Sequence, residues 1–247
     1  MERIALISDI HGNLPAFEAT LNDIERRGIT RIVCLGDLAG KGPHGDVVVD
    51  ICRARCEGVI RGNWDDGLAT QTHTDPALRW HQDRLGSERL AYLRALPNSV
   101  DLTLSGHRIR LLHASPRGVY SRVYQEDPDE TLRAMFDSTD FTGYGGDPDV
   151  VGYGDIHEAY MRTFETKTLV NVGSVGNPLD QPLACYAIFE GFRDDAPGPL
   201  TITLVRLPYD IERAIQEATR EGMPELEPYA VELRTARYQR GAPAPHD

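Results

Sequence analysis

The chain has 247 residues, of which 40% are hydrophobic and 26% charged, and these values exclude a disordered chain. Lys and Arg number 26 against 38 Asp and Glu, a formal net charge of -12, so we expect no extended nucleic-acid surface. No apolar run is long enough to span a bilayer, and the segment after Met1 is not typical of a signal peptide. Because the four cysteines are too dispersed for a disulfide framework, we expect a cytoplasmic protein with no membrane partner.

The first part of the chain alternates short apolar runs with segments of helical periodicity. The runs predict buried strands at 4–8, 32–36 and 59–62, and the periodic segments predict helices at 14–27 and 46–56. This alternation is typical of parallel strands joined by helical crossovers. The residues that follow each strand then lie on one edge of an α/β sheet, where ligands bind.

The rest of the chain predicts a helical segment, a hairpin and further strands. A polar helical stretch at about 65–96 suggests a lid over the site, and a hairpin with strands at 102–104 and 109–112 follows it. Later strands are expected at 150–154, 168–172, 185–190 and 200–207, before a C-terminal helical extension at about 209–240 that opens with a helix at 211–220. We expect a single α/β domain over residues 1–247.

Five of the apolar runs end in residues that can ligate a metal. They are Asp9, His11, Asp37, Asn63, His113, Asp155 and His157. Each residue alone is also common in a turn or at a strand edge. Two patterns favour metal binding: the Asp-x-His spacing can bring an oxygen and a nitrogen to one cation, and the two oxygens of Asp37 can bridge two cations.

The chain resembles the calcineurin-like metallophosphoesterase family, in its small bacterial phosphodiesterase branch, through five motifs. These are SDIHGNLPA at 8–16, LGD at 35–37, GN at 62–63, HASPR at 113–117 and NVGSVG at 171–176. The resemblance covers nearly the whole chain and implies a four-layer αββα sandwich with a binuclear metal centre at the strand ends.

The same resemblance implies a ligand set for two divalent metal ions. Asp9, His11, Asp37 and His157 would hold the first ion, and Asp37, Asn63, His113 and Asp155 would hold the second. We expect manganese, with iron, nickel or zinc as alternatives.

Two positions depart from the family pattern. The last family motif normally reads Gly-His-x-His, but here Gly154 is followed by Asp155, a carboxylate that favours harder ions such as manganese. Many members carry a His directly after the Asn of the Gly-Asn motif, but this chain has Trp64, which has no titratable proton. The general acid is therefore unassigned, and the candidates from the predicted lid are Asp65, His73 and His81.

The expected activity is hydrolysis of phosphoester or phosphoanhydride bonds in small phosphorylated or nucleotide substrates, through a metal-bridging hydroxide. A phosphodiesterase fits this expectation, and dinucleoside polyphosphates are one possible substrate group. Asn13 and Arg117 are candidates for contacts with the substrate phosphate. The alternatives are a catalytically decayed metal-binding or scaffold protein on the same fold, and a DNA nuclease, which the negative charge disfavours. The sequence leaves the oligomeric state open.

Overall fold

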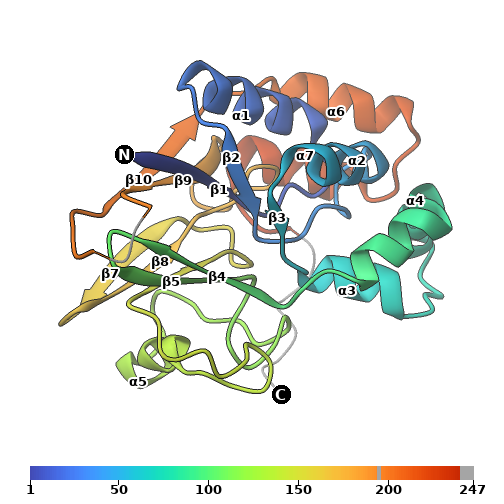
Figure 1. Ribbon diagram of the computed structural model, residues 1–247. Coiled ribbons are helices and arrows are strands. Elements are labelled where there is room, and N and C mark those ends of the chain that lie inside the picture. The colour runs from blue at the N-terminus through green and yellow to red at the C-terminus, as the bar shows by residue number, and fades with distance from the viewer. Residues whose placement is uncertain (194–195, 240–247) are drawn as a thin grey trace.

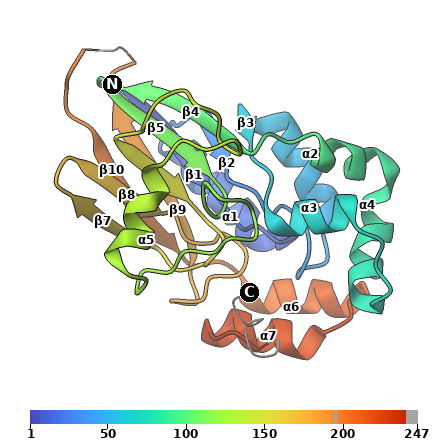
Figure 2. The same ribbon diagram turned by 90° about the horizontal axis from the view of Figure 1, so that it is seen from below.

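Two sheets of five strands lie face to face, with helices on both outer sides (Figures 1 and 2). The computed structural model describes residues 1–193 and 196–239. The architecture is the predicted αββα sandwich. Within the described residues, no helix is both long enough and apolar enough to span a membrane.

The first sheet contains the predicted parallel strands at its centre and one edge. Its order is β10 (Thr201–Leu207), β9 (Ala184–Gly191), β1 (Glu2–Ile7), β2 (Arg31–Cys34) and β3 (Gly58–Val59). The parallel strands β1, β2 and β3 are joined by helices α1 (Leu14–Arg26) and α2 (Gly45–Arg55). Because Ile7 pairs with Cys34, the chain leaves β1 and β2 at the same edge.

The second sheet is built around the predicted hairpin. Its order is β4 (Ser99–Leu104), β5 (His107–Leu112), β6 (Val150–Tyr153), β8 (Lys167–Asn171) and β7 (Tyr160–Phe164). Strands β5, β6 and β8 are parallel, and antiparallel β4 and β7 form the edges. The sequence did not predict β7, an edge strand with an exposed Met161, nor the short helices α5 (Asp129–Arg133) and η1 (Ala134–Phe136).

Apolar side chains fill the spaces between the layers. Leu6, Val33 and Leu111 belong to the core between the two sheets. Phe17 and Ile24 of α1 belong to the core on the outer side of the first sheet. Burial of these side chains fixes the sheets against each other, so the loops at their shared edge have a defined position.

Two helix pairs complete the molecule. The predicted lid region contains α3 (Asn63–Thr70) and α4 (Pro76–Arg94), which lie beside the sheets in both views (Figures 1 and 2). Leu85 and Leu93 of α4 are buried in the core that also contains residues of α2, and a lid function for this region stays a prediction. The C-terminal extension contains α6 (Ile211–Arg220) and α7 (Leu226–Thr235).

Candidate metal centre

The ends of β1, β2, β3, β5 and β6 bring all seven candidate ligands to one place. Asp9, His11 and His157 form one cluster, which we call the Asp9 group. His157 Nε2 is 3.1 Å from His11 Nε2 and 3.2 Å from Asp9 Oδ1. All three side chains are buried. One carboxylate and two imidazoles at this separation could share a metal ion.

Asn63, His113 and Asp155 form the second cluster, which we call the His113 group. His113 Nε2 is 3.0 Å from Asn63 Oδ1 and 3.8 Å from Asp155 Oδ1. Asp37 lies between the groups: its Oδ2 is 3.5 Å from His11 Nε2, and its Oδ1 is 3.5 Å from His113 Nε2. Each oxygen of Asp37 therefore faces a different group.

Backbone carbonyls orient the three imidazoles. The Nδ1 atoms of His11, His113 and His157 lie 3.3, 2.8 and 2.5 Å from carbonyl oxygens, in the order Ala39, Leu35 and Asn177. A carbonyl oxygen only accepts hydrogen bonds, so each Nδ1 carries a proton and each Nε2 turns toward the centre. This is the arrangement that prepares a histidine to ligate a metal through Nε2.

Two further features fit a bound cation. The Nε2 atoms of His11 and His157 are 3.1 Å apart, and their lone pairs repel each other unless a cation or proton lies between them. Among the residues that the structure describes, Asp9 Oδ1 and Asp155 Oδ2 are buried and have no hydrogen-bond partner. A buried carboxylate oxygen without a partner is costly, and a metal ion would supply that partner.

The electrostatics of the site also favour added positive charge. Burial raises the pKa of Asp37 well above its usual range, and the neighbouring Asp9, Asp65 and Asp155 carboxylates raise it further. Burial alone would lower the pKa of His113, but the carboxylates of Asp37, Asp9 and Asp155 raise it to about 9. The carboxylates therefore create a position where a cation is stabilised.

The backbone at the site is strained. Five candidate ligands have positive φ angles between 49° and 66°, a region that residues other than glycine rarely adopt. They are Asp9, His11, Asp37, Asp155 and His157. Hydrogen bonds from Asp9 N to Gly36 O, 3.0 Å, and from His11 N to Asp37 O, 2.9 Å, hold the first two loops together. This strain has no signature in the sequence.

The close approach of Asp37 explains why a glycine, Gly62, precedes Asn63. A Cβ atom at Gly62 would lie 2.1 Å from Asp37 Oδ1 and 2.4 Å from Asp37 N. Only glycine lets the loop after β3 approach Asp37 this closely. The Gly-Asn motif thus combines a side-chain ligand with a site of close backbone contact.

Asp65, one of the general-acid candidates, contacts the backbone of two ligand loops. Its carboxylate accepts hydrogen bonds from the N–H groups of Asp37, Leu38 and Gly62, at 2.8, 3.0 and 3.0 Å. The side chain is fully buried. The structure therefore gives Asp65 a positioning role, because it joins the loop after β2 to the loop after β3.

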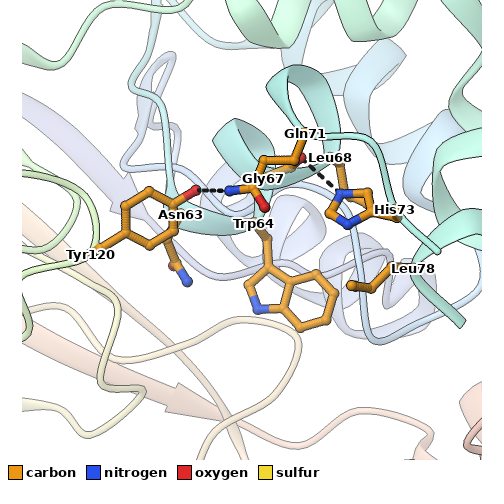
Figure 3. Close-up of a pocket in the computed structure, with 8 residues that line it drawn as sticks. All are labelled: Asn63, Trp64, Gly67, Leu68, Gln71, His73, Leu78 and Tyr120. Atoms are coloured by element: carbon orange, nitrogen blue, oxygen red, sulfur yellow. Dashed lines mark hydrogen bonds between the residues drawn. The ribbon is translucent and has the colours of Figure 1, made fainter. Parts of the chain in front are cut away.

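The other two general-acid candidates lie around Trp64. His73 Nε2 is 2.9 Å from Gly67 O, at a small pocket of about 170 Å³ that Asn63, Trp64 and Tyr120 also line (Figure 3). His81 is buried, and its ring is nearly perpendicular to that of Trp64, which in turn is nearly perpendicular to the ring of His11. Trp64 thus lies between His81 and a metal-ligand candidate.

The two residues expected to contact the substrate phosphate have different surroundings. Asn13 is fully buried, and its Oδ1 caps α1 through Ala16 N while its Nδ2 donates to Gly176 O at 2.7 Å. This amide is used within the fold, which argues against a contact with phosphate. Arg117 is exposed and is not among the residues that line the cavity beside the metal centre.

Sequence reasoning did not find Arg122. This residue lines a cavity of about 240 Å³ together with Asp37, Asp155, His157 and Trp64. Arg122 Nε is 3.3 Å from Asp155 Oδ1. No motif contains Arg122, and only the folded loop after His113 places it at the cavity.

A second unpredicted feature is a buried network that joins the C-terminal extension to the Asp9 group. Asn177, whose carbonyl orients His157, accepts a 2.7 Å hydrogen bond from Lys41 Nζ through Oδ1. Its Nδ2 donates to Glu232 Oε2 of α7 at 3.0 Å, and Lys41 Nζ is 3.6 Å from the same oxygen. Glu232 is fully buried, so α7 supports the site from a distant part of the chain.

Comparisons with known proteins agree with this fold. A family model described as the calcineurin-like phosphoesterase superfamily domain matches residues 2–192. An uncharacterized protein of Methanocaldococcus jannaschii is 32% identical over 237 residues, which cover 90% of this chain and 94% of that protein.

Two solved structures are also similar. A metallophosphoesterase from Sphaerobacter thermophilus is 25% identical with a TM-score of 0.74, and the match covers 95% of this chain and 99% of that one. A hypothetical protein from Pyrococcus horikoshii is 18% identical with a TM-score of 0.76, and the match covers 98% and 100% of the two chains. The second similarity concerns the fold alone.

Proposed function

We propose that this chain, which belongs to the calcineurin-like phosphoesterase superfamily, hydrolyses phosphodiester or phosphoanhydride bonds of small substrates with two divalent metal ions. The observation that carries the proposal is the geometry of Asp37. Its two oxygens face two histidine-containing groups at equal distances of 3.5 Å. A carboxylate in that position is suited to bridge two cations.

The Asp9 group and Asp37 would hold one ion, and Asp37 with the His113 group would hold the other. When bound, such a pair of ions lowers the pKa of water and neutralises charge on the phosphoryl oxygens. Three imidazoles among the ligands favour manganese over magnesium, which prefers oxygen ligands and water.

The protein's own residues keep this geometry rigid. The carbonyls of Leu35, Ala39 and Asn177 fix the imidazole rings, and Asp65 fixes the backbone beside Asp37. The reacting groups therefore need little reorganisation, which is the main contribution of a preorganised site.

The size of the cavity supports a small substrate. It measures about 240 Å³ and is lined by the carboxylates of Asp37 and Asp155, by the imidazole of His157, by Arg122 and by Trp64. The net charge of -12 argues against a substrate that needs an extended basic surface. Phosphodiesters are the first class to test, and dinucleoside polyphosphates are a narrower class within the proposal.

A second candidate function is a metal-binding or scaffold protein without turnover. The observation that favours it is Trp64, whose indole packs against His11 at a ring distance of 5.8 Å and cannot donate a titratable proton. Stoichiometric metal binding with no hydrolysis of any phosphoester would support this candidate.

The experiment that tests the proposal is a panel of metals against substrates on the purified protein. We expect activity to disappear on prolonged dialysis against a chelator and to return with manganese more than with magnesium, because the centre offers three imidazoles. Metal content by mass spectrometry and circular dichroism of the dialysed protein separate metal loss from unfolding. Full activity in excess chelator would contradict the two-metal proposal.

A further inference from the structure

Arg122 joins the cavity to the metal centre. Its guanidinium pairs with Asp155, while 41% of the Arg122 side chain remains exposed and only 1% of the Asp155 side chain does. Arg122 also lines the cavity together with Asp37 and His157. The guanidinium of Arg122 therefore lies at the boundary between the buried candidate ligands and the open cavity.

We propose that Arg122 binds the phosphoryl group of the substrate beside the metal centre, an inference that rests on the proposed function. The His113 group and Asp37 contribute two buried carboxylates to the wall of the cavity, Asp37 and Asp155. These charges repel an incoming phosphate anion. A guanidinium within 3.3 Å of Asp155 reduces that repulsion and offers its remaining N–H donors to the anion.

The placement of Arg122 also separates it from Arg117. Both arginines follow His113 in the chain, but only Arg122 is among the residues that line the cavity. A planar guanidinium binds phosphate with paired hydrogen bonds, so an arginine at this boundary suits an anionic substrate better than a lysine would. The position of Arg122 in the cavity wall therefore favours Arg122 over Arg117 for the phosphate contact.

Arg122 is not needed merely to balance the charge of Asp155. Asp155 also lies 3.8 Å from His113 Nε2, and an ion held by the His113 group would balance the charge of Asp155. Because much of Arg122 is in solvent, its replacement removes few buried contacts, and the folded structure should tolerate the change. A loss of phosphate binding in the variant would then reflect the loss of a contact with phosphate and not a loss of folded structure.

The test is calorimetric binding of inorganic phosphate to the manganese-loaded protein. We expect Arg122→Ala to weaken phosphate binding about 10- to 100-fold, the usual value of a charge-assisted hydrogen bond. Arg122→Lys should recover part of the affinity, because lysine keeps the charge but loses the planar donor set. The matched control is Arg133→Ala, which removes an exposed arginine paired with Glu165 at 2.7 Å, and it should bind phosphate as the wild type does.

Kinetics and metal content complete the experiment. With bis(4-nitrophenyl) phosphate as the probe, Arg122→Ala should raise KM by a larger factor than it lowers kcat. Unchanged phosphate affinity in Arg122→Ala would overturn the inference. So would loss of manganese from that variant, because Arg122 would then act by holding Asp155.

The proposed function and this inference can fail separately. If the wild type shows no turnover but its phosphate binding depends on Arg122, the inference stands and the proposed hydrolysis is wrong. If the wild type hydrolyses the probe and Arg122→Ala matches it in KM and phosphate affinity, only the inference is wrong. If the wild type does not bind phosphate, the inference is wrong.

Discussion

The Asp9 group and the His113 group use similar residues but differ in what surrounds them. Asp9 and His11 are fully buried, and His157 is held through Asn177 by a buried network. In the His113 group, Asn63 is half-buried and Asp155 pairs with the partly exposed Arg122. The comparison teaches that the neighbours of each group, a buried network in one case and a partly exposed arginine in the other, separate two tasks, and we expect the Asp9 group to anchor metal and the His113 group to meet the substrate.

The C-terminal extension adds to this difference. Glu232 of α7 contacts Asn177, and Asn177 orients His157 of the Asp9 group. The imidazole of the His113 group is instead oriented by Leu35, which belongs to the first sheet's own loop. The Asp9 group therefore depends on a segment that lies outside the residues matched by the family model.

The largest effect is expected where the two groups meet. Asp37→Asn should abolish turnover and reduce binding of both metals, because one oxygen of Asp37 faces each group. The metal-free variant should melt no lower than the wild type, since the change removes a buried charge whose pKa is already raised by burial and by neighbouring carboxylates. Activity, metal content and thermal melting in chelator check this.

A matched control for Asp37→Asn is Asp50→Asn. Asp50 is half-exposed and pairs with Arg89 on the helical side of the molecule, so this change should leave activity and metal content at wild-type values. An Asp37→Asn variant with a wild-type rate would show that Asp37 does not bridge the groups.

Changes at Asp155 should affect the ion of the His113 group more than the ion of the Asp9 group. The effect on activity should be smaller than that of losing Asp37. Asp155→Ala should weaken binding of the ion by the His113 group. The ion of the Asp9 group should stay in place, because that group has its own candidate ligands. Asp155→His should retain both ions, shift the preference from manganese toward softer metals and tighten binding of an anionic substrate. Metal titrations and steady-state kinetics under several defined metals measure both outcomes.

If Asp155→Ala matches the wild type in metal stoichiometry and in rate, Asp155 is not a ligand. Asp155 would then not belong to the substrate-facing group, and the residues assigned to the two groups would have to be revised.

The smallest effect on catalysis is expected from Glu232→Gln. The change replaces a buried carboxylate 3.6 Å from Lys41 Nζ by a neutral amide, so the free energy of unfolding should fall by on the order of 3 kcal/mol. Manganese affinity of the Asp9 group should fall about 10-fold, the low end for loss of support behind a metal ligand.

The control for Glu232→Gln is Glu227→Gln, an exposed position on the same helix. Denaturant unfolding and manganese titration compare the two variants. Equal manganese affinity in Glu232→Gln and the wild type would show that α7 stabilises the fold without supporting the Asp9 group.

Local pattern predicted much of the fold. Helix α6 begins and ends at the predicted residues, α1 differs from its predicted range by one residue at its C-terminal end, and α2 differs by one residue at each end. Each of these helices has a periodic apolar face that is buried against a sheet or against other helices, and this periodicity can be recognised in the sequence. Strand β7 and helix α5 have no such apolar periodicity. An edge strand with exposed residues and a helix of five residues have too few buried positions to produce it.

The sequence by itself determined that seven candidate metal ligands follow strand ends, since parallel crossovers bring such ends to one edge. Only the tertiary structure decided what each polar group contacts. Asp65 receives three backbone N–H groups, and Glu232 reaches Asn177 from 55 positions along the chain. A buried polar side chain takes whatever partner the fold brings near it, and such partners leave no periodic trace in the sequence.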